Sequence, residues 1–132
     1  MSASIVAAMR DRREELRTFA LSLPEAAEDF PWGEPVAKVR GKVFVFLGRD
    51  EPPGPRLITV KLAESHGHAL AIDGAEPTGY GLGRSGWVNV PLEAPDVTPG
   101  LLRDWIEESY RTVAPKRLVA ELDARPSFTR EQ

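Results

Sequence analysis

Residues 35–62 read PVAKVRGKVFVFLGRDEPPGPRLITVKL, and this stretch decides the fold. Residues 36–40 and 42–47 are rich in β-branched and aromatic side chains, which is typical of strands. Gly41 lies between them and can adopt the positive φ that a short hairpin turn requires. The prolines and glycine of residues 52–55 cannot continue a ladder, so a longer loop is expected before a third strand over residues 56–62.

The third strand alternates strictly, which predicts that one of its faces is buried and the other is not. The residues of the two faces are Ile58, Val60 and Leu62 on one side, and Leu57, Thr59 and Lys61 on the other. In the second strand, Phe44 and Phe46 are two residues apart and are expected to share a face.

The flanking segments predict helices around this ribbon. Apolar residues return at helical spacing from Ile5 to Leu23, and Pro24 ends that helix. A rigid aromatic loop should follow over residues 25–35. The later segments predict a short helix over 63–72, strands over 75–80 and 87–91, a strong helix over 98–113 that is capped by Thr98, and a last helical turn or two over 116–122. The tail is expected to fray from about residue 124.

This order of elements, α-β-β-β-α-β-β-α, predicts an α+β fold: a two-layer sandwich with a single, mainly antiparallel sheet of about five strands and helices on one face. The 132 residues suit one domain over residues 1–132. A composition of 42% hydrophobic and 28% charged residues is that of a folded globular protein. The chain has no cysteine, which excludes disulfides and thiolate metal sites. Neither a signal peptide nor a long apolar run is found, so a cytoplasmic location without membrane contact is expected.

Basic residues concentrate in the central ribbon. The chain has a net charge of −3, whereas residues 36–62 hold six basic and two acidic residues and therefore carry +4. Such polarity could bring one face to a polyanion. The candidate phosphate contacts are Lys38, Arg40, Lys42 and Arg49, with Arg84 as a secondary anion contact. The alternative is that these charges only maintain solubility and prevent sheet edges from pairing.

Aromatic residues offer a second candidate surface. Most are expected in the core, Trp105 among them, because it lies on the apolar stripe of the 98–113 helix. Trp32 and Tyr80 occupy a loop and a strand end, so they are the two aromatic residues expected to be exposed.

Three other patterns give weaker evidence of a functional site. Residues 81–86, GLGRSG, match G-x-G-x-x-G, but a strand rather than a helix follows, which argues against a dinucleotide site. His66 and His68 have no third ligand nearby, so solvated side chains are favoured over a metal site, and no cofactor is expected. Among the adjacent carboxylates, Glu28-Asp29 lies beside Phe30 and Trp32, where an apolar pocket could retune an acid.

Several segments together resemble the MmcQ/YjbR family. They are Pro24-Glu25, residues 30–35 (FPWGEP), residues 38–44 (KVRGKVF), residues 77–80 (PTGY), residues 87–90 (WVNV) and Ser109-Tyr110. The resemblance extends from about Ile5 to Leu122. It implies a CyaY-like or secretion-chaperone-like α+β fold and a DNA-binding role through a double-wing surface.

Three functions follow as hypotheses. The first is a small, non-enzymatic DNA-binding protein that contacts phosphates weakly and with little sequence preference through its basic hairpin wings. The second is an adaptor that binds a protein or peptide, which an exposed apolar patch containing Trp32 or Tyr80 would favour. The third is a small-ligand binder or enzyme that uses Glu28, Asp29 and Trp32, which a pocket enclosing those side chains would favour.

Overall fold

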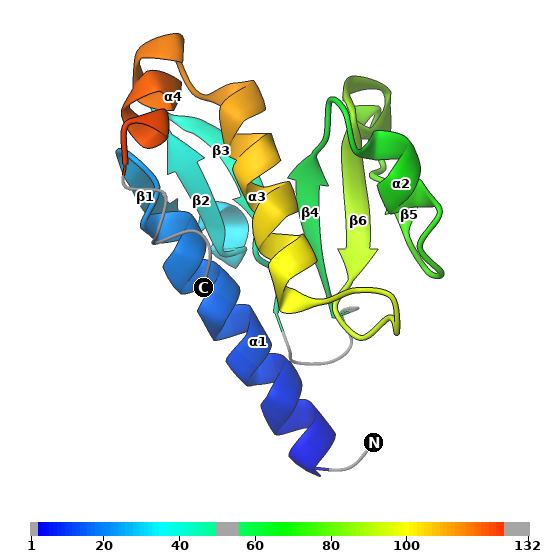
Figure 1. Cartoon of the computed structure of the whole chain (residues 1–132). Helices are drawn as coiled ribbons and strands as arrows, with labels where there is room; N and C mark the ends of the chain where they lie inside the picture. The colour runs from blue at the N-terminus through cyan, green and yellow to red at the C-terminus, as the bar shows by residue number, and fades with distance from the viewer. Residues whose placement is uncertain (1–2, 50–55, 126–132) are drawn as a thin grey trace.

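A six-stranded antiparallel sheet forms one layer of the molecule (Figure 1). The structure is a computed structural model that describes residues 3–49 and 56–125, with side chains from residue 12 onward. The strands are β1 (Ala26–Asp29), β2 (Val36–Val39), β3 (Lys42–Phe46), β4 (Leu57–Lys61), β5 (Glu76–Pro77) and β6 (Trp87–Pro91), in the spatial order β1-β2-β3-β4-β6-β5. The predicted α+β class and single antiparallel sheet are therefore confirmed.

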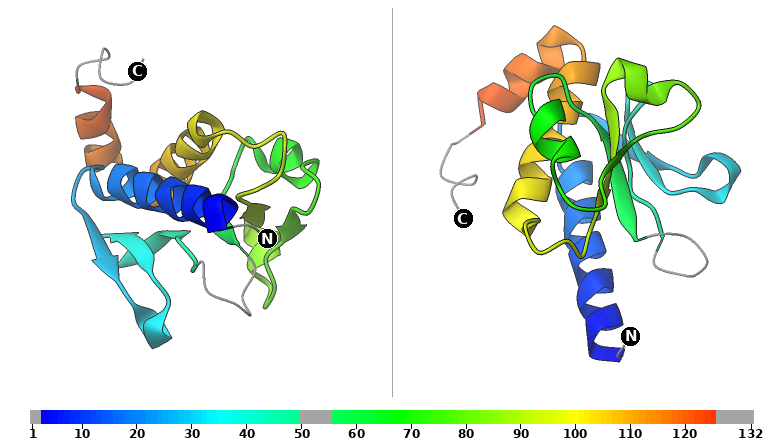
Figure 2. Two further views of the ribbon diagram at one scale, coloured as in Figure 1. Left: turned by 90° about the horizontal axis from the view of Figure 1, so that it is seen from below. Right: turned by 90° about the vertical axis from the view of Figure 1, so that its right-hand side faces the viewer.

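Helices form the second layer and lie on one side of the sheet in both views of Figure 2. They are α1 (Ala3–Leu21), α2 (His66–Leu70), α3 (Pro99–Val113) and α4 (Lys116–Asp123). The side chain of Thr98 accepts a hydrogen bond from the N–H of Leu101, as the predicted cap requires. No helix among the described residues is both long enough and apolar enough to cross a membrane.

Two sequence predictions about elements are wrong in detail. Residues 26–29 were expected in a loop but form edge strand β1, because their backbone pairs with β2 although their side chains, AAED, lack strand character. The 75–80 strand shrinks to the two residues of β5, since Pro77 cannot donate to a ladder. The glycine-rich connection between β5 and β6 contains a 3₁₀ turn, η2 (Leu82–Ser85). The predicted tail lies outside the described residues from 126 on, as does the loop over 50–55.

A β-bulge separates two residues that were expected to share a face. The pairing of β2 with β3 shifts after Ala37, which opposes Val45, whereas Lys38 opposes Val43. Phe44 is thus the extra residue. Its ring meets Tyr110 of α3 edge-on with centroids 5.2 Å apart, whereas Phe46 points to the other side and meets Trp87 at 5.4 Å.

Two residues of α3 form hydrogen bonds to backbone carbonyl groups of β3 and of the loop before β1. Buried Ser109 donates to the carbonyl of Phe44 and accepts from the N–H of Lys61 at 2.8 Å, so its hydroxyl fills the gap where β3 and β4 separate. The adjacent Tyr110 donates its hydroxyl proton to the carbonyl of Pro24 at 2.7 Å. Both contacts satisfy buried backbone groups that would otherwise cost about 1–3 kcal/mol each.

We call the side of the sheet that no helix covers the open face. Paired residues of antiparallel strands point to the same side, which assigns its members. They are Ala27, Asp29, Val36, Lys38, Val43, Phe46, Leu57, Thr59, Lys61, Glu76, Trp87, Asn89 and Pro91. Their neighbours along the strands, such as Ala37, Ile58, Val60 and Val88, belong instead to the fully buried core under the helices.

Candidate functional site

Lys38 and Arg40, two of the predicted phosphate contacts, form ion pairs in the structure. The Lys38 ammonium lies 2.7 Å from a carboxylate oxygen of Asp29. Arg40 lies 2.7 Å from Glu25, and Arg117 of α4 contacts the same carboxylate at 3.2 Å. The hydrogen bonds from Arg40 and Arg117 lower the pKa of Glu25. The Arg40-Gly41 turn is thus held beside α4 and is not a free wing.

The other three predicted cations are dispersed. Arg49 donates to the carbonyl of Gly33 at 2.5 Å and lies 3.6 Å from Glu34. Lys42 and Arg84 are exposed, and among the described residues neither has a carboxylate within 4.0 Å. Lys42 opposes Val39, so it points to the helix side, whereas Lys38 points to the open face. The structure therefore does not gather the five cations into one patch.

Trp32 and Tyr80 are exposed, as the sequence predicted. Trp32 is 97% exposed, and Tyr80 is fully exposed. Trp32 belongs to a short turn, η1 (Pro31–Gly33), between β1 and β2, and Tyr80 lies two residues before η2, separated from it by Gly81. In Figure 2 the η1 turn extends away from α1 and α3, and the segment that holds η2 also lies on the side of the sheet away from α3. The two rings therefore rise from turns that flank the open face.

Both aromatic residues have a backbone conformation that bulky side chains avoid. The φ angle is 52° at Trp32 and 59° at Tyr80, in the left-handed region. A non-glycine residue there costs about 1–3 kcal/mol unless its surroundings compensate it. Packing cannot supply that compensation, because the two rings are exposed. The backbone strain at these two positions is therefore not offset by packing of the rings in the described structure. Strained residues of this kind cluster at sites that contact a ligand or partner.

The open face between the two turns is largely covered by contacts among its own side chains. Thr59 and Trp87 on the open face are at most 9% exposed. The hydroxyls of Thr59 and Thr78 both donate to the amide oxygen of Asn89, at 2.8 and 2.9 Å. These bonds fix the carboxamide and leave its NH₂ group without an acceptor among the described residues. The open face is therefore rigid, and the exposed apolar surface is on the turns.

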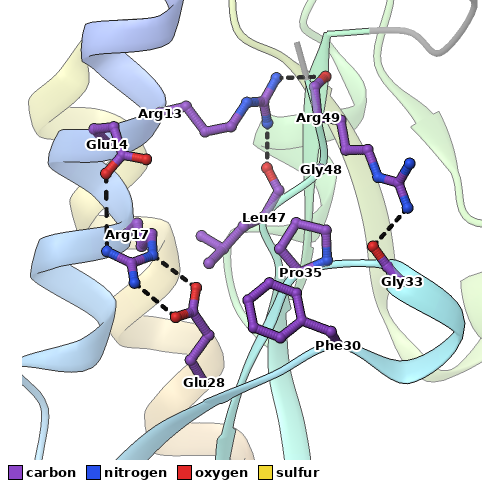
Figure 3. A pocket seen from close by; sticks show the side chains of 10 residues that line it. All are labelled: Arg13, Glu14, Arg17, Glu28, Phe30, Gly33, Pro35, Leu47, Gly48 and Arg49. Carbon is purple, nitrogen blue, oxygen red and sulfur yellow. Dashed lines mark hydrogen bonds and ion pairs between the residues drawn. The ribbon is translucent and has the colours of Figure 1, made fainter. Parts of the chain in front are cut away.

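A cleft lies on the other side of the sheet, between α1 and the ends of β1 and β3 (Figure 3). Its volume is about 720 Å³. One wall carries Arg13 and Arg17 from α1, and the opposite wall carries Arg49 from the chain after β3. Phe30, Pro35 and Leu47 form its apolar part. Five of the ten lining residues are charged, so the cleft is more polar than the mainly apolar lining that is usual for small-molecule sites.

Arg13 and Arg17 are held firmly. Buried Arg13 donates to the carbonyl oxygens of Leu47, Leu57 and Arg49 and so joins the end of β3 to the start of β4. This approach requires Gly48, since a Cβ there would lie 2.4 Å from the Leu57 carbonyl oxygen at a φ of 72°. Arg17 donates two hydrogen bonds of 2.6 Å to Glu28, and these lower the pKa of the Glu28 carboxyl although burial opposes them.

The predicted grouping of Glu28, Asp29 and Trp32 does not occur in this cleft. Glu28 lines it, but its carboxylate is neutralised by Arg17, and neither Asp29 nor Trp32 is among the lining residues. Asp29 lies on the open face, where hydrogen bonds from Lys38 and from the N–H of Phe30 lower its pKa. Both carboxylates are thus ionised at neutral pH and unsuited to act as acids.

The histidines and the glycine-rich segment give no metal or nucleotide site. His68 packs its ring against Trp105 with centroids 5.3 Å apart. Among the described residues, no three His, Asp or Glu side chains could hold a metal ion. Residues 82–85 form the 3₁₀ turn η2, and strand β6 follows, so no long helix presents its N-terminus to a phosphate.

Sequence reasoning missed the cleft and the roles of Arg13 and Arg17. Both lie among charged residues of α1, RDRREELR, which is typical of a solvated helix face. The hydrogen bonds described above join them to residues between 11 and 44 positions away in the chain. Gly48 is the one local signal, because a glycine at the end of a strand often marks a close backbone approach.

Comparison with known proteins gives one match. The model of the family described as YjbR matches residues 21–112, which run from the end of α1 to α3 and include the whole sheet. Neither the curated proteins nor the solved structures contain a match.

Proposed function

The chain belongs to the YjbR family, and we propose that it is a binding module that holds an extended, apolar peptide segment of another protein between its two aromatic turns. The observation that carries the proposal is the exposure of Trp32 and Tyr80 at strained backbone positions beside the open face. Trp and Tyr contribute large contact areas at low entropic cost, and they are the residues on which protein interfaces most often depend.

Charge supports a peptide partner over a polyanion. Three of the five predicted phosphate contacts have a carboxylate within 3.6 Å, so much of their positive charge is already neutralised. The whole chain carries −3. Nucleic-acid binding depends on several uncompensated cations that release counterions from phosphates. An apolar segment needs no such excess, because burial of its side chains against aromatic rings supplies the free energy.

The fixed polar groups of the open face suit a peptide backbone. The NH₂ group of Asn89 can donate to a carbonyl oxygen, and its orientation is set by Thr59 and Thr78 before any ligand arrives. Lys61 is partly exposed on the same face and can also donate to a carbonyl. These donors would set the position of a peptide whose apolar side chains contact the two rings.

DNA binding is the second candidate. It is favoured by the exposure of Lys42 and Arg84, which have no carboxylate partner within 4.0 Å among the described residues. Two phosphate contacts predict weak binding with a shallow salt dependence. In this second candidate function, Lys42 and Arg84 would be the residues that contact phosphates.

One titration series separates the two candidates. Fluorescein-labelled decapeptides from an array that varies apolar and aromatic content, and a labelled duplex, are added to the protein and to the Trp32→Ala, Tyr80→Ala and Lys42→Ala/Arg84→Ala variants. We expect aromatic-rich peptides to bind and to lose at least about tenfold in affinity in either single variant, with little effect of salt or of the double variant. Absence of peptide binding, together with duplex binding that only the Lys42→Ala/Arg84→Ala variant abolishes, would overturn the peptide proposal.

A further inference from the structure

The cleft between α1 and the η1 turn carries an inference that goes beyond the proposed function. We propose that it binds a small organic carboxylate that bears an apolar group, with Arg49 as the residue that recognises the carboxylate. The cleft lies on the helix side of the sheet, so this site is distinct from the open face (Figure 3).

Arg49 is the lining arginine whose guanidinium retains the most unused donors. Its Nη2 group donates to the carbonyl of Gly33, and no acceptor for its Nε and Nη1 groups is found in the described part of the chain. The other two arginines are committed, because Arg17 binds Glu28 through two hydrogen bonds and Arg13 donates to three carbonyl oxygens. One available guanidinium selects a ligand with a single planar anionic group, since a carboxylate matches its fork.

The net charge of the lining side chains also favours a ligand with a single negative charge. Its lining side chains include the three arginines and two carboxylates, Glu14 and Glu28, so they carry one excess positive charge. Glu34 competes for Arg49, but the 3.6 Å separation and the exposure of both side chains, about half of each, make this a weak pair. A bound carboxylate would replace Glu34 as the partner of Arg49.

The apolar part of the ligand is assigned by the apolar side chains that line the cleft. Phe30 is 55% exposed although it lines the cleft, and Pro35 and Leu47 lie beside it. A ring or short aliphatic group placed against Phe30 would bury apolar surface on both partners. A cleft of about 720 Å³ lies within the range of about 300–1,000 Å³ that is usual for small ligands.

The test uses 3-phenylpropionate as the probe and 3-phenylpropanamide as its uncharged counterpart. Each is titrated into the isotope-labelled protein, and amide chemical shifts are followed by NMR. We expect saturable shifts at residues 28–35 and 47–49 with the acid, and at least about tenfold weaker binding of the amide, because a hydrogen bond between charged groups is replaced by a neutral one. Equal affinity of acid and amide, or no saturable shift with the acid, would overturn the proposal.

Two variants are expected to change the affinity for 3-phenylpropionate in opposite directions, which makes the test specific. Arg49→Gln should weaken binding of 3-phenylpropionate about tenfold, and Glu34→Gln should strengthen it about twofold to fivefold, because Glu34 no longer competes. Arg117→Gln removes an exposed arginine of α4 that does not line the cleft and is the matched control, expected to leave binding unchanged. Phe30→Ala tests the apolar wall without touching a charge and should weaken binding several-fold. Unchanged binding in both Arg49→Gln and Phe30→Ala would place the ligand elsewhere and refute the site.

Discussion

The two faces of one sheet differ although they are built from alternate residues of the same strands. The helix side is filled mainly by aliphatic side chains around the Phe44–Tyr110 pair, and the Ser109 hydroxyl there binds the buried carbonyl of Phe44. The open face carries an aromatic pair, a threonine–asparagine cluster and an ion pair, and two turns with exposed rings flank it. The helix side therefore forms the main core of the fold, whereas the open face has its most exposed apolar side chains on the turns beside it.

The largest expected difference is between the two phenylalanines of β3. Phe44→Ala should destabilise the protein by about 3–5 kcal/mol, because Phe44 is fully buried against Tyr110. Phe46→Ala should cost about half as much, since Phe46 is only partly buried and loses mainly its contact with Trp87. Urea unfolding followed by circular dichroism measures both. Equal losses of stability in the two variants would show that the open face contributes as much to folding stability as the helix side.

The next comparison concerns hydroxyl groups. Ser109→Ala should cost about 1–3 kcal/mol, because the buried carbonyl of Phe44 and the partly buried N–H of Lys61 both lose their partner. Thr59→Val keeps the shape of the side chain and should cost at most about 1 kcal/mol, since the Asn89 oxygen still accepts from Thr78. The same unfolding assay applies. A larger cost for Thr59→Val than for Ser109→Ala would reverse the assignment of the two faces.

A smaller effect is expected from the ion pair at the cleft. The Arg17 hydrogen bonds lower the pKa of Glu28 in the folded protein, so the unfolded chain binds the proton more readily. The stabilisation is therefore present above the unfolded pKa of about 4.3 and is lost as the pH falls through the lower folded pKa. Glu28→Gln should cost about 1 kcal/mol at pH 7 and flatten the fall in stability below pH 5.

Comparison of wild type and Glu28→Gln by urea unfolding between pH 3 and pH 7 checks this prediction. Asp29→Asn serves as the matched control on the open face, where the pair with Lys38 is more exposed and should contribute less. If Glu28→Gln follows the pH dependence of wild type, the ion pair with Arg17 does not stabilise the fold.

The smallest effect on stability is expected at the exposed turns. Trp32→Gly relieves the left-handed strain at φ 52° and loses almost no buried surface, but glycine also gains entropy in the unfolded chain. The net change should lie between zero and about 1 kcal/mol of stabilisation. Thermal unfolding measures it, and a destabilisation beyond about 1 kcal/mol would mean that the ring supports the fold.

Much of the architecture could be predicted from local patterns. The Gly41 turn and the capped apolar stripe of α3 depend on residues close in sequence, and both appear in the structure. The alternation of β4 is only partly confirmed, because Thr59 on the face predicted to be unburied is buried as well. The exposure of Trp32 and Tyr80 also followed from their loop contexts. Strand β1 could not be predicted, because its sequence, AAED, acquires strand geometry only from pairing with β2.

The sites were less predictable than the fold. A cluster of cations in sequence does not reveal which of them meet a carboxylate, and the partners of Lys38, Arg40 and Arg49 became clear only in three dimensions. The bulge at Phe44 reversed the expected relation of two aromatic side chains, because one extra residue moves the strand out of simple alternation. The cleft depends on contacts between α1 and distant strands, which no local pattern contains.

The most direct test of the binding face is an NMR titration of the isotope-labelled protein with the tightest aromatic-rich decapeptide from the array. The account predicts amide shifts at the two turns and on the open face, at Trp32, Phe46, Tyr80 and Asn89, and none around the Arg40-Gly41 turn or α4. Shifts confined to that turn and α4, with the open face unchanged, would contradict it.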